Sequence, residues 1–181
     1  MKDPVIIQQY NDEWPVIYAE LRRKIIEQVG TMVKRIDHIG STAVVGLAAK
    51  PIIDVQISVF DLNKIDGIKA GLEVLGYHHR KDNDDLTKRY FRESPEMRRT
   101  HIHVRQLGSW SEQFNLLFPD YLREHEFERN EYARVKFDLA DQYRDQRERY
   151  VDGKTEIVWN IMLKANKWSQ EIGWQPSKSD L

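Results

Sequence analysis

The chain has 181 residues, which suits one domain with a sizeable core, and its 40% hydrophobic and 31% charged residues are typical of a globular protein with a polar surface. Its 28 Lys and Arg nearly balance 29 Asp and Glu, so the formal net charge of -1 gives no support to bulk binding of nucleic acid or membrane. The absence of cysteine excludes disulfides, zinc–thiolate sites and thiol nucleophiles, and the absence of a signal peptide or of roughly 18 consecutive apolar residues predicts a cytoplasmic protein.

The N-terminal part of the chain alternates between helical and strand patterns. A helix is expected to start near Pro15, where a cap and an early acid come together, and to end at Gly30. The run from 52 to 60 is apolar and β-branched, which is typical of a buried central strand. The other elements expected before residue 78 are an edge strand at 5–7, a strand at 33–39, a short helix at 44–49 and a helix capped at 61–63 and ended by Gly76.

Two further strands and a set of helices are expected in the rest of the chain. Residues 78–85 are polar and predict a loop, and the two strands lie at 86–92 and 100–107. Helices follow from Ser109 onward, and Pro119 is expected to kink or restart the first of them. The predicted organisation is a single α+β domain over 1–181, with a mixed α/β core at 1–108, a helical half at 109–170 and a flexible tail at 171–181.

A Gly-Ser-Thr turn, formed by Gly40, Ser41 and Thr42, stands between a predicted strand and a predicted short helix. Glycine lets the backbone approach a phosphate closely, and the N-terminus of a helix offers unpaired N–H groups to an anion. The same tripeptide is also common as an ordinary turn or helix cap. The turn therefore indicates an anion site only together with other residues.

Asp54 interrupts the apolar strand at 52–60. An unpaired buried carboxylate is costly, so this side chain is expected at a strand end, paired with a cation, or bound to a metal ion. An ion pair with Lys50 or a nearby arginine is the structural alternative to a functional site.

His101 and His103 lie two residues apart on a predicted strand, so their side chains share one face while Ile102 and Val104 point into the core. Two imidazoles on one face can bind a metal ion or contact phosphate. A polar sheet face with satisfied side chains is the alternative. His38, just before the turn, is a further candidate ligand.

These residues form a pattern that resembles the GrpB family. The matching segments are residues 38–44, 46–54, 101–104, 120–123, 131–133 with Lys136, and Tyr150 with Lys154, within a similarity from about Tyr10 to Lys164. The family resembles the nucleotidyltransferase superfamily in fold, which implies a nucleotidyltransferase-like mixed sheet, a Gly-Ser turn for triphosphate and two or three carboxylates holding Mg²⁺. Its fusion to dephospho-CoA kinase domains in some members implies coenzyme A or nucleotide metabolism.

One position of the strand departs from the pattern of an active nucleotidyltransferase. Such an enzyme has a second carboxylate two residues after the first, because two carboxylates on one face hold two metal ions. Here Asp54 is followed by Gln56, whose carbonyl oxygen can coordinate a metal but brings no charge. A site completed by histidines suits Zn²⁺, Mn²⁺ or Fe²⁺ better than Mg²⁺.

The sequence leaves three functions open. The first is a metal-dependent transferase that binds a nucleotide or a phosphorylated small molecule, the second is a non-catalytic module for such an anion, and the third is a hydrolase with a His–Asp metal centre. Nucleic acid is not expected as the ligand, because no stripe of aromatic and basic residues is present. The expected ligands of a divalent ion (Mg²⁺, Mn²⁺ or Zn²⁺) are Asp54, His101 and His103, which are also the expected catalytic residues, with Gln56 and His38. The expected phosphate contacts are Gly40, Ser41, Thr42, Lys50, Arg123, Lys136 and Lys154.

Overall fold

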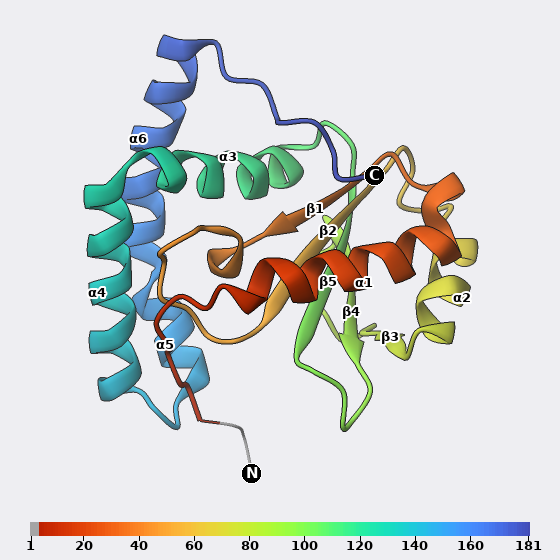
Figure 1. Ribbon diagram of the computed structural model, residues 1–181, viewed down its shortest axis with the longest axis horizontal. Helices are drawn as coiled ribbons and strands as arrows, with labels where there is room; N and C mark the ends of the chain where they lie inside the picture. The colour runs from red at the N-terminus through yellow and green to blue at the C-terminus, as the bar shows by residue number, and fades with distance from the viewer. Residues whose placement is uncertain (1–3) are drawn as a thin grey trace.

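The computed structural model describes residues 4–181 of the chain (Figure 1). Its elements are α1 (Glu13–Val29), η1 (Gly30–Met32), β1 (Arg35–Ile39), η2 (Ser41–Ala43), β2 (Ile53–Val59), α2 (Asp66–Val74), β3 (Tyr77–His79), β4 (Lys88–Glu93), β5 (Thr100–Gln106), α3 (Trp110–Glu124), α4 (Glu126–Gln142), α5 (Arg147–Gly153) and α6 (Thr155–Ile172). The elements η1 and η2 are single turns of 3₁₀ helix.

The five strands form one mixed sheet in the order β1-β2-β5-β4-β3. Only β2 and β5 run parallel, and the other neighbours are antiparallel. The parallel pair lies in the middle of the sheet, where burial suits the apolar run that the sequence places at 52–60. The expected fold class, a mixed α+β sheet with an N-terminal helix followed by a helical half, is confirmed.

The two faces of the sheet differ in polarity, because successive side chains of a strand point to opposite faces. One face is apolar and packs on α1 and α2, and α1 contributes a stripe at helical spacing that includes Trp14, Ile25 and Val29 (Figure 1). The register sets Asp54 beside His101 and Gln56 beside His103 on the other face. The polar side chains of the two central strands thus converge on the face away from α1.

Helix α3 packs on this polar face near β1. It starts with a side-chain N-cap, in which the Ser109 hydroxyl accepts the N–H of Glu112 at 3.3 Å. The fully buried Glu112 carboxylate accepts hydrogen bonds from the Ser58 hydroxyl and the Gly108 N–H, so it ties α3 to β2. Of the two expected effects of Pro119, a kink or a restart, the restart does not occur, because Pro119 is buried inside one helix that runs from Trp110 to Glu124.

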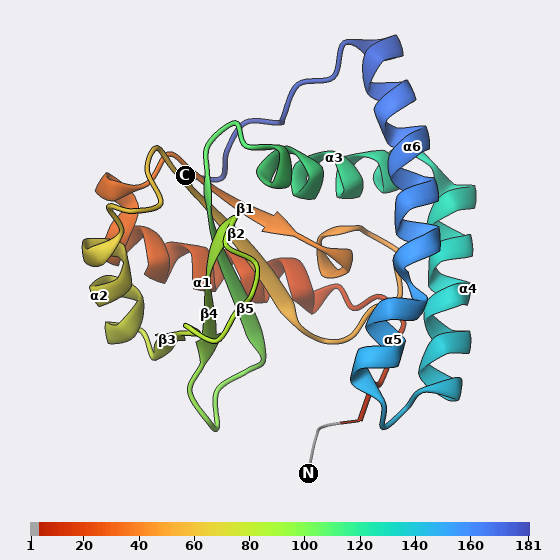
Figure 2. The same cartoon turned by 180° about the vertical axis from the view of Figure 1, so that it is seen from behind.

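Helices α4, α5 and α6 stand together beside the sheet (Figure 2). Val44 and Leu47, from the loop after η2, are fully buried in the core that α3, α4 and α6 share. The expected helix at 44–49 is absent, because Gly46 adopts a φ of 80° and the chain turns there. The loop therefore anchors the Gly-Ser turn at the junction between the sheet and the helical half.

Three other local predictions differ from the structure. Residues 5–7 form no strand, and Gln8 makes only an isolated bridge with Ala49. Part of the predicted loop at 78–85 belongs to the edge strand β3, which is three residues long and depends on its pairing with β4. Helix α5 was not expected, because its charged residues show no clear apolar period.

The C-terminal tail was expected to be flexible, yet it runs back from α6 to the edge of the sheet (Figure 1). The backbone of Ile36 in β1 accepts the N–H of Asp180 at 3.0 Å and donates to the Ser179 hydroxyl at 3.0 Å. The Asp180 carboxylate also accepts from the Tyr18 hydroxyl at 2.8 Å. Residues 177–181 therefore cover the open edge of β1, a contact that composition does not reveal.

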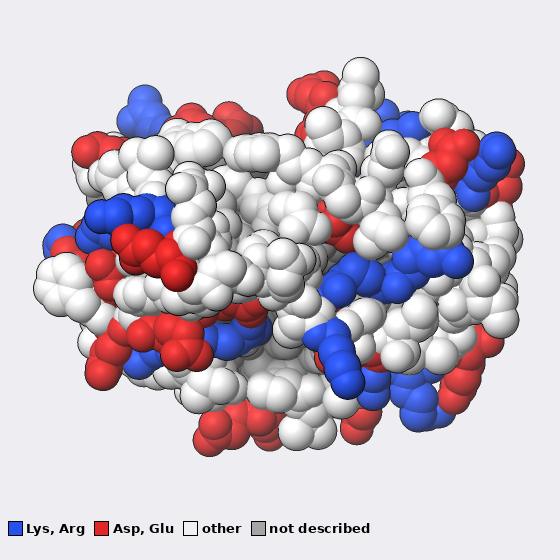
Figure 3. Space-filling view, turned by 90° about the horizontal axis from the view of Figure 1, so that it is seen from above, with Lys and Arg blue, Asp and Glu red and all other residues white. Residues whose placement is uncertain are grey.

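The surface mixes both signs of charge on the face seen in Figure 3, where Lys and Arg alternate with Asp and Glu around a largely uncharged centre. This matches the nearly balanced composition of the chain. No helix within residues 4–181 has the length and apolar character needed to cross a membrane.

Candidate functional site

Three side chains from β2 and β5 meet on the polar face of the sheet. The Oδ1 atom of Asp54 lies 3.0 Å from Nδ1 of His101 and 3.4 Å from Nε2 of His103. The parallel register creates this contact, because it sets Asp54 directly beside His101. Within residues 4–181 this is the group of acids and histidines whose ligand atoms are close enough to hold one metal ion. The predicted pairing of these three residues is therefore present.

The tight fit of this group depends on Gly40. Its φ of 71° and ψ of −169° are accessible in practice only to glycine. A Cβ atom at Gly40 would also lie 2.9 Å from Oδ2 of Asp54. Gly40 therefore allows the backbone of the turn to lie directly against the Asp54 carboxylate. The close backbone approach that was predicted for a phosphate is made here to Asp54.

The electrostatics of the group favour an ionised carboxylate. Burial alone would raise the pKa of Asp54, but the hydrogen bonds with His101 and His103 outweigh it and hold the pKa well below its usual range. Burial also lowers the pKa of His103, so a neutral imidazole is favoured there. An ionised carboxylate beside a neutral imidazole belongs to the donor set that Zn²⁺ or Mn²⁺ prefers.

The geometry also fits a metal ion. Around an ion with bonds of about 2.0–2.2 Å, neighbouring ligand atoms lie about 3–3.5 Å apart, as the Asp54 oxygen does from each of the two imidazole nitrogens. Tyr90 of β4 covers both rings, with its centroid 5.6 Å from His101 and 5.2 Å from His103. The second nitrogen of each ring is buried and has no hydrogen-bond partner among the described residues. The only polar contacts of the two rings are thus directed at Asp54.

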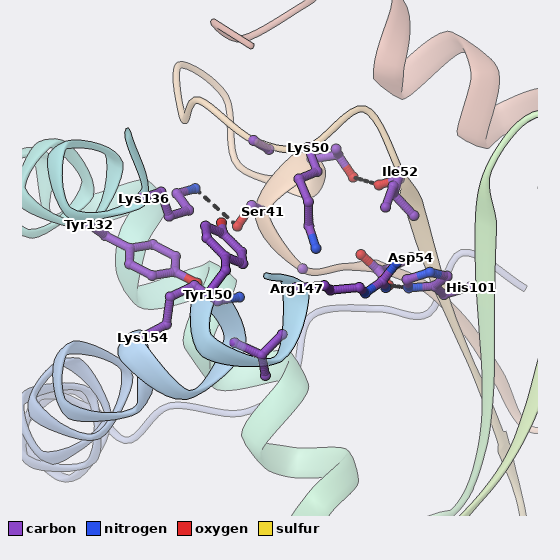
Figure 4. Close-up of a pocket in the computed structure, with 14 residues that line it drawn as sticks. Ser41, Lys50, Ile52, Asp54, His101, Tyr132, Lys136, Arg147, Tyr150 and Lys154 are labelled. Atoms are coloured by element: carbon purple, nitrogen blue, oxygen red, sulfur yellow. Dashed lines mark hydrogen bonds and ion pairs between the residues drawn. The ribbon is translucent and has the colours of Figure 1, made fainter. Parts of the chain in front are cut away.

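A cavity of about 300 Å³ opens beside Asp54, between the Gly-Ser turn and the helical half (Figure 4). Four cationic side chains line it, against the single carboxylate of Asp54. They come from three parts of the chain, and they are Lys50, Lys136, Arg147 and Lys154. Such an excess of positive charge in a cleft favours an anionic ligand.

Lys50 and Lys154 share one aromatic ring. Their Nζ atoms lie 5.1 Å and 4.8 Å from the centroid of Tyr150. Burial, together with the neighbouring cations, lowers the pKa of Lys50 to about 8 and also lowers the pKa of Lys154. Neither ammonium group makes an ion pair within residues 4–181, so both retain the capacity to bind an anion.

Lys136 is the most buried cation of the cavity, with 2% of its surface exposed. Its Nζ atom lies 3.2 Å from the Ser41 hydroxyl, donates to the carbonyl of Ala48, and lies over the ring of Tyr132 at 4.4 Å. Burial and the nearby Lys154 and Lys50 lower the pKa of Lys136 to about 6. A lysine that is neutral at pH 7 is unusual, and it lies at the back of the cavity.

The low pKa of Lys136 predicts a pH-dependent cost to stability. Between about pH 6 and pH 9 the unfolded chain binds the proton that the folded chain has lost, so stability rises with pH by about 1 kcal/mol for each pH unit. The variant Lys136→Met removes this titration and should be more stable than the parent near pH 6, with a difference that shrinks toward pH 9. Urea unfolding at several pH values measures it, and Lys64→Met, whose side chain is 84% exposed, is the control with no such trend.

His38 does not join the metal group, contrary to the prediction. It pairs with Val55 across β1 and β2, and its side chain therefore lies on the face packed against α1. Its Nε2 atom is 3.0 Å from the Thr42 hydroxyl, and its ring stacks on Tyr18 at 4.5 Å. Burial lowers the pKa of His38 to about 4, so it is a neutral core residue.

Gln56 lies on the correct face but is not available as a ligand. Its amide nitrogen donates to the carbonyl of Glu112 at 3.3 Å, and its carbonyl oxygen accepts from Asn115 at 3.1 Å. The side chain is fully buried between β2 and α3. Both polar atoms of the Gln56 amide are therefore already hydrogen-bonded to α3, and Gln56 is not part of the Asp54–His101–His103 group.

Thr42, which lines the cavity, and Arg123, which does not, both make hydrogen bonds that support the turn. The buried Thr42 hydroxyl donates to the carbonyl of Ile52 at 3.2 Å. The Arg123 guanidinium donates to the carbonyl of Ala43 at 2.8 Å and pairs with Asp120, outside the lining of the cavity. Both residues therefore fix the position of Ser41.

Arg147, Tyr132 and Tyr150 line the cavity but were not predicted as site residues. Arg147 lies in a charged run at 144–149 that looks like a solvated surface in the sequence. The sequence does contain a pattern that points to the two tyrosines. Tyr132 and Tyr150 each precede a cavity lysine by four residues, and this spacing places the tyrosine and the lysine on the same side of a helix.

Comparison with known proteins agrees with this architecture. The sequence model described as GrpB protein matches residues 4–164. Protein YqkA of Bacillus subtilis is 32% identical over 169 residues, which cover 93% of this chain, and a dephospho-CoA kinase of Mycobacterium tuberculosis is 28% identical over 198 residues, which cover 96%. The match covers 49% of each relative, so the chain spans about half the length of these two proteins.

A solved structure gives the same result for the fold. The crystal structure of the conserved protein GrpB from Enterococcus faecalis superimposes with a TM-score of 0.83 and 30% sequence identity, and the match covers 91% of this chain and 99% of that one. The resemblance suggested by residues 38–54 is confirmed, and the chain belongs to the GrpB family.

Proposed function

We propose that this protein binds a nucleotide or another phosphorylated small molecule in the cavity, beside a divalent metal ion held by Asp54, His101 and His103. The observation that carries the proposal is the convergence of Lys50, Arg147 and Lys154 on a cleft with one carboxylate. Keeping cations partly desolvated without a counter-charge is costly, and a bound phosphate repays that cost.

The positions of the acidic and basic side chains within the cavity also support the proposal. Asp54 and His101 lie at the sheet end, Lys136 and Lys154 lie at the helical end, and Lys50 enters from the segment before β2 (Figure 4). A metal ion at Asp54 would therefore contact one side of a phosphate while the lysines contact the other, which is the usual arrangement for binding polyphosphates. The relative named dephospho-CoA kinase carries a name from coenzyme metabolism, which agrees with a ligand of this class.

The transfer chemistry of nucleotidyltransferases is a weaker part of the proposal. It needs two carboxylates on one strand face, and Gln56 stands at the second position, bound to α3. A single ion of the Zn²⁺ or Mn²⁺ type fits the donor set better. That ion would supply a Lewis acid or an activated water for hydrolysis of the bound molecule.

Calorimetric titration with ADP and with inorganic pyrophosphate, each with and without Mn²⁺ or Zn²⁺, tests the proposal. We expect binding with proton uptake near pH 8, because an anion raises the lowered pKa of Lys50. At about 100 times the dissociation constant, the ligand should stabilise the fold by about 2–3 kcal/mol. Lys50→Met should weaken binding at least about tenfold, whereas the exposed control Lys64→Met should not.

The metal is tested separately on the dialysed protein. One equivalent of Zn²⁺ or Mn²⁺ should bind, and Asp54→Asn should weaken the affinity by about 100-fold or more, with Asp61→Asn as the control. Absence of anion binding under every condition would contradict the proposal as a whole. Anion binding that is unaffected by metal and by Asp54→Asn would support a second candidate, a metal-independent anion-binding module, which the fixed position of Gln56 favours.

A further inference from the structure

The Ser41 hydroxyl lies between the open cavity and the buried amine of Lys136. Its oxygen lines the cavity and is 3.2 Å from the Nζ atom of Lys136 (Figure 4). Burial raises the pKa of Tyr132, and the Ser41 side chain partly opposes this effect. Thr42 and Arg123 fix the turn on both sides of Ser41 through backbone carbonyls. Ser41 thus has a rigid position, an amine behind it and free space in front of it.

The groups around Lys136 all favour its neutral form. On its own helix it faces Tyr132, and from the segment before β2 it faces the Ala48 carbonyl and Lys50. The helical half adds Lys154, and the Asp54 carboxylate across the cavity makes no ion pair with Lys136. Burial and the two lysines lower the pKa of Lys136 to about 6, so its lone pair is available to the Ser41 hydroxyl at neutral pH.

A purely structural role for Lys136 does not require a buried amine beside Ser41. A neutral polar residue would hold the Ser41 hydroxyl without the cost of burying an amine among cations. An amine that is deprotonated at neutral pH and in contact with a serine is a general base beside a nucleophile, the arrangement that activates serine in Ser–Lys enzymes.

We propose that Ser41 and Lys136 form a nucleophile and base pair that accepts an acyl group from a carboxylic ester with a negatively charged group elsewhere in the molecule. The Ser41 proton moves to Lys136 as the Oγ–carbon bond forms and the carbonyl electrons move onto oxygen. The ester C–O bond then breaks, and Lys136 returns the proton to the leaving oxygen. A water molecule releases the acyl group by the same steps in reverse, with its proton taken by Lys136.

The other cavity residues complete this chemistry. Lys50, Arg147 and Lys154 line the same space and would stabilise the negative charge on the carbonyl oxygen or hold the charged part of the ester. The requirement for a negatively charged group in the ester rests on the proposed function, because that group would bind the same cations. The reactivity of Ser41 does not depend on the proposed function, so it is tested separately from the binding of the charged group.

The test uses 4-nitrophenyl acetate, a small neutral ester that needs no anion site. The full chain is mixed with the ester near pH 7.5, quenched with acid and digested, and acetylation is assigned by peptide mass spectrometry. We expect an acetyl group on Ser41 and not on Ser169, a half-buried serine of α6. Ser41→Ala should abolish this adduct, and Lys136→Met should slow its formation at least about 100-fold.

Two further measurements separate a base from a structural lysine. Lys136→Arg keeps a cation that cannot lose its proton, so it should be as slow as Lys136→Met if Lys136 is a base. The rate of Ser41 acetylation in the parent protein should rise with pH and level off above about pH 7, since the pKa of Lys136 is about 6. No adduct on Ser41, an unchanged rate in either Lys136 variant, or a rate still rising at about pH 9 would overturn the proposal. Acetylation of Ser41 without any binding of ADP or pyrophosphate would uphold the pair and reject the proposed ligand.

Discussion

Replacing Gly40 with alanine is expected to destabilise the protein by more than about 2 kcal/mol and to disrupt the Asp54 group at the same time. The backbone at φ 71° and ψ −169° is costly for any residue with a Cβ, by about 1–3 kcal/mol. The new Cβ would also lie 2.9 Å from Oδ2 of Asp54, and either the turn or the carboxylate must move. Urea unfolding measures the first effect, and titration with Zn²⁺ or Mn²⁺ measures the second.

Gly108 provides the matched control for this change. Its φ of 73° is nearly the same, but a Cβ there would meet no atom within 4 Å. Gly108→Ala should therefore show the cost of a positive φ alone, without any effect on metal or anion binding. If both alanine variants bind metal like the parent, the close contact between Gly40 and Asp54 has no functional importance.

The variant Trp14→Ala is expected to cost about 3–5 kcal/mol of unfolding free energy, which is a large part of the stability of a domain of this size. Trp14 is 1% exposed and belongs to the core between α1 and the apolar face of the sheet. Its ring meets Tyr10 edge-to-face at 5.4 Å, and truncation would leave a large cavity beneath α1. The midpoint of urea unfolding measures the loss.

Trp110→Ala is the control for Trp14. This tryptophan is 67% exposed at the start of α3, where it contacts Phe114 and Trp159 near the surface. Its removal should cost about 1 kcal/mol or less. Similar losses in the two variants would contradict the assignment of Trp14 to the main core.

The buried strand was predictable from the sequence, and so was the shared face of His101 and His103. An apolar β-branched run predicts a central strand, and a two-residue period places both imidazoles on one side. The contact between Asp54 and His101 was not determined by these local rules, because it depends on β2 and β5 being parallel neighbours in one register. The family pattern supplied that expectation.

The places of His38 and Gln56 outside the Asp54 group have a common cause. Both residues lie close to Asp54 along the chain or in the sheet, but proximity does not determine which face a side chain occupies or what already binds it. The register of β1 turns His38 toward α1, since a shift of one residue reverses the face. Gln56 points the right way, yet the amide is bound by α3, an element that starts more than fifty residues later.

The sequence by itself determined the fold class, the family, the central strand with Asp54 and the importance of the Gly-Ser turn, because each depends on short-range patterns or on a long motif. Only the tertiary structure decided the chemistry of the site. It brought Lys50, Lys136 and Lys154 from three distant segments into one cavity, and burial near other cations lowered the pKa of all three. It also gave Ser41 a neutral amine as its neighbour. Ser41, in the turn that the sequence indicates as a phosphate-binding loop, is therefore a candidate nucleophile. The low pKa of its neighbour Lys136 results from desolvation, which arises only when the protein is packed.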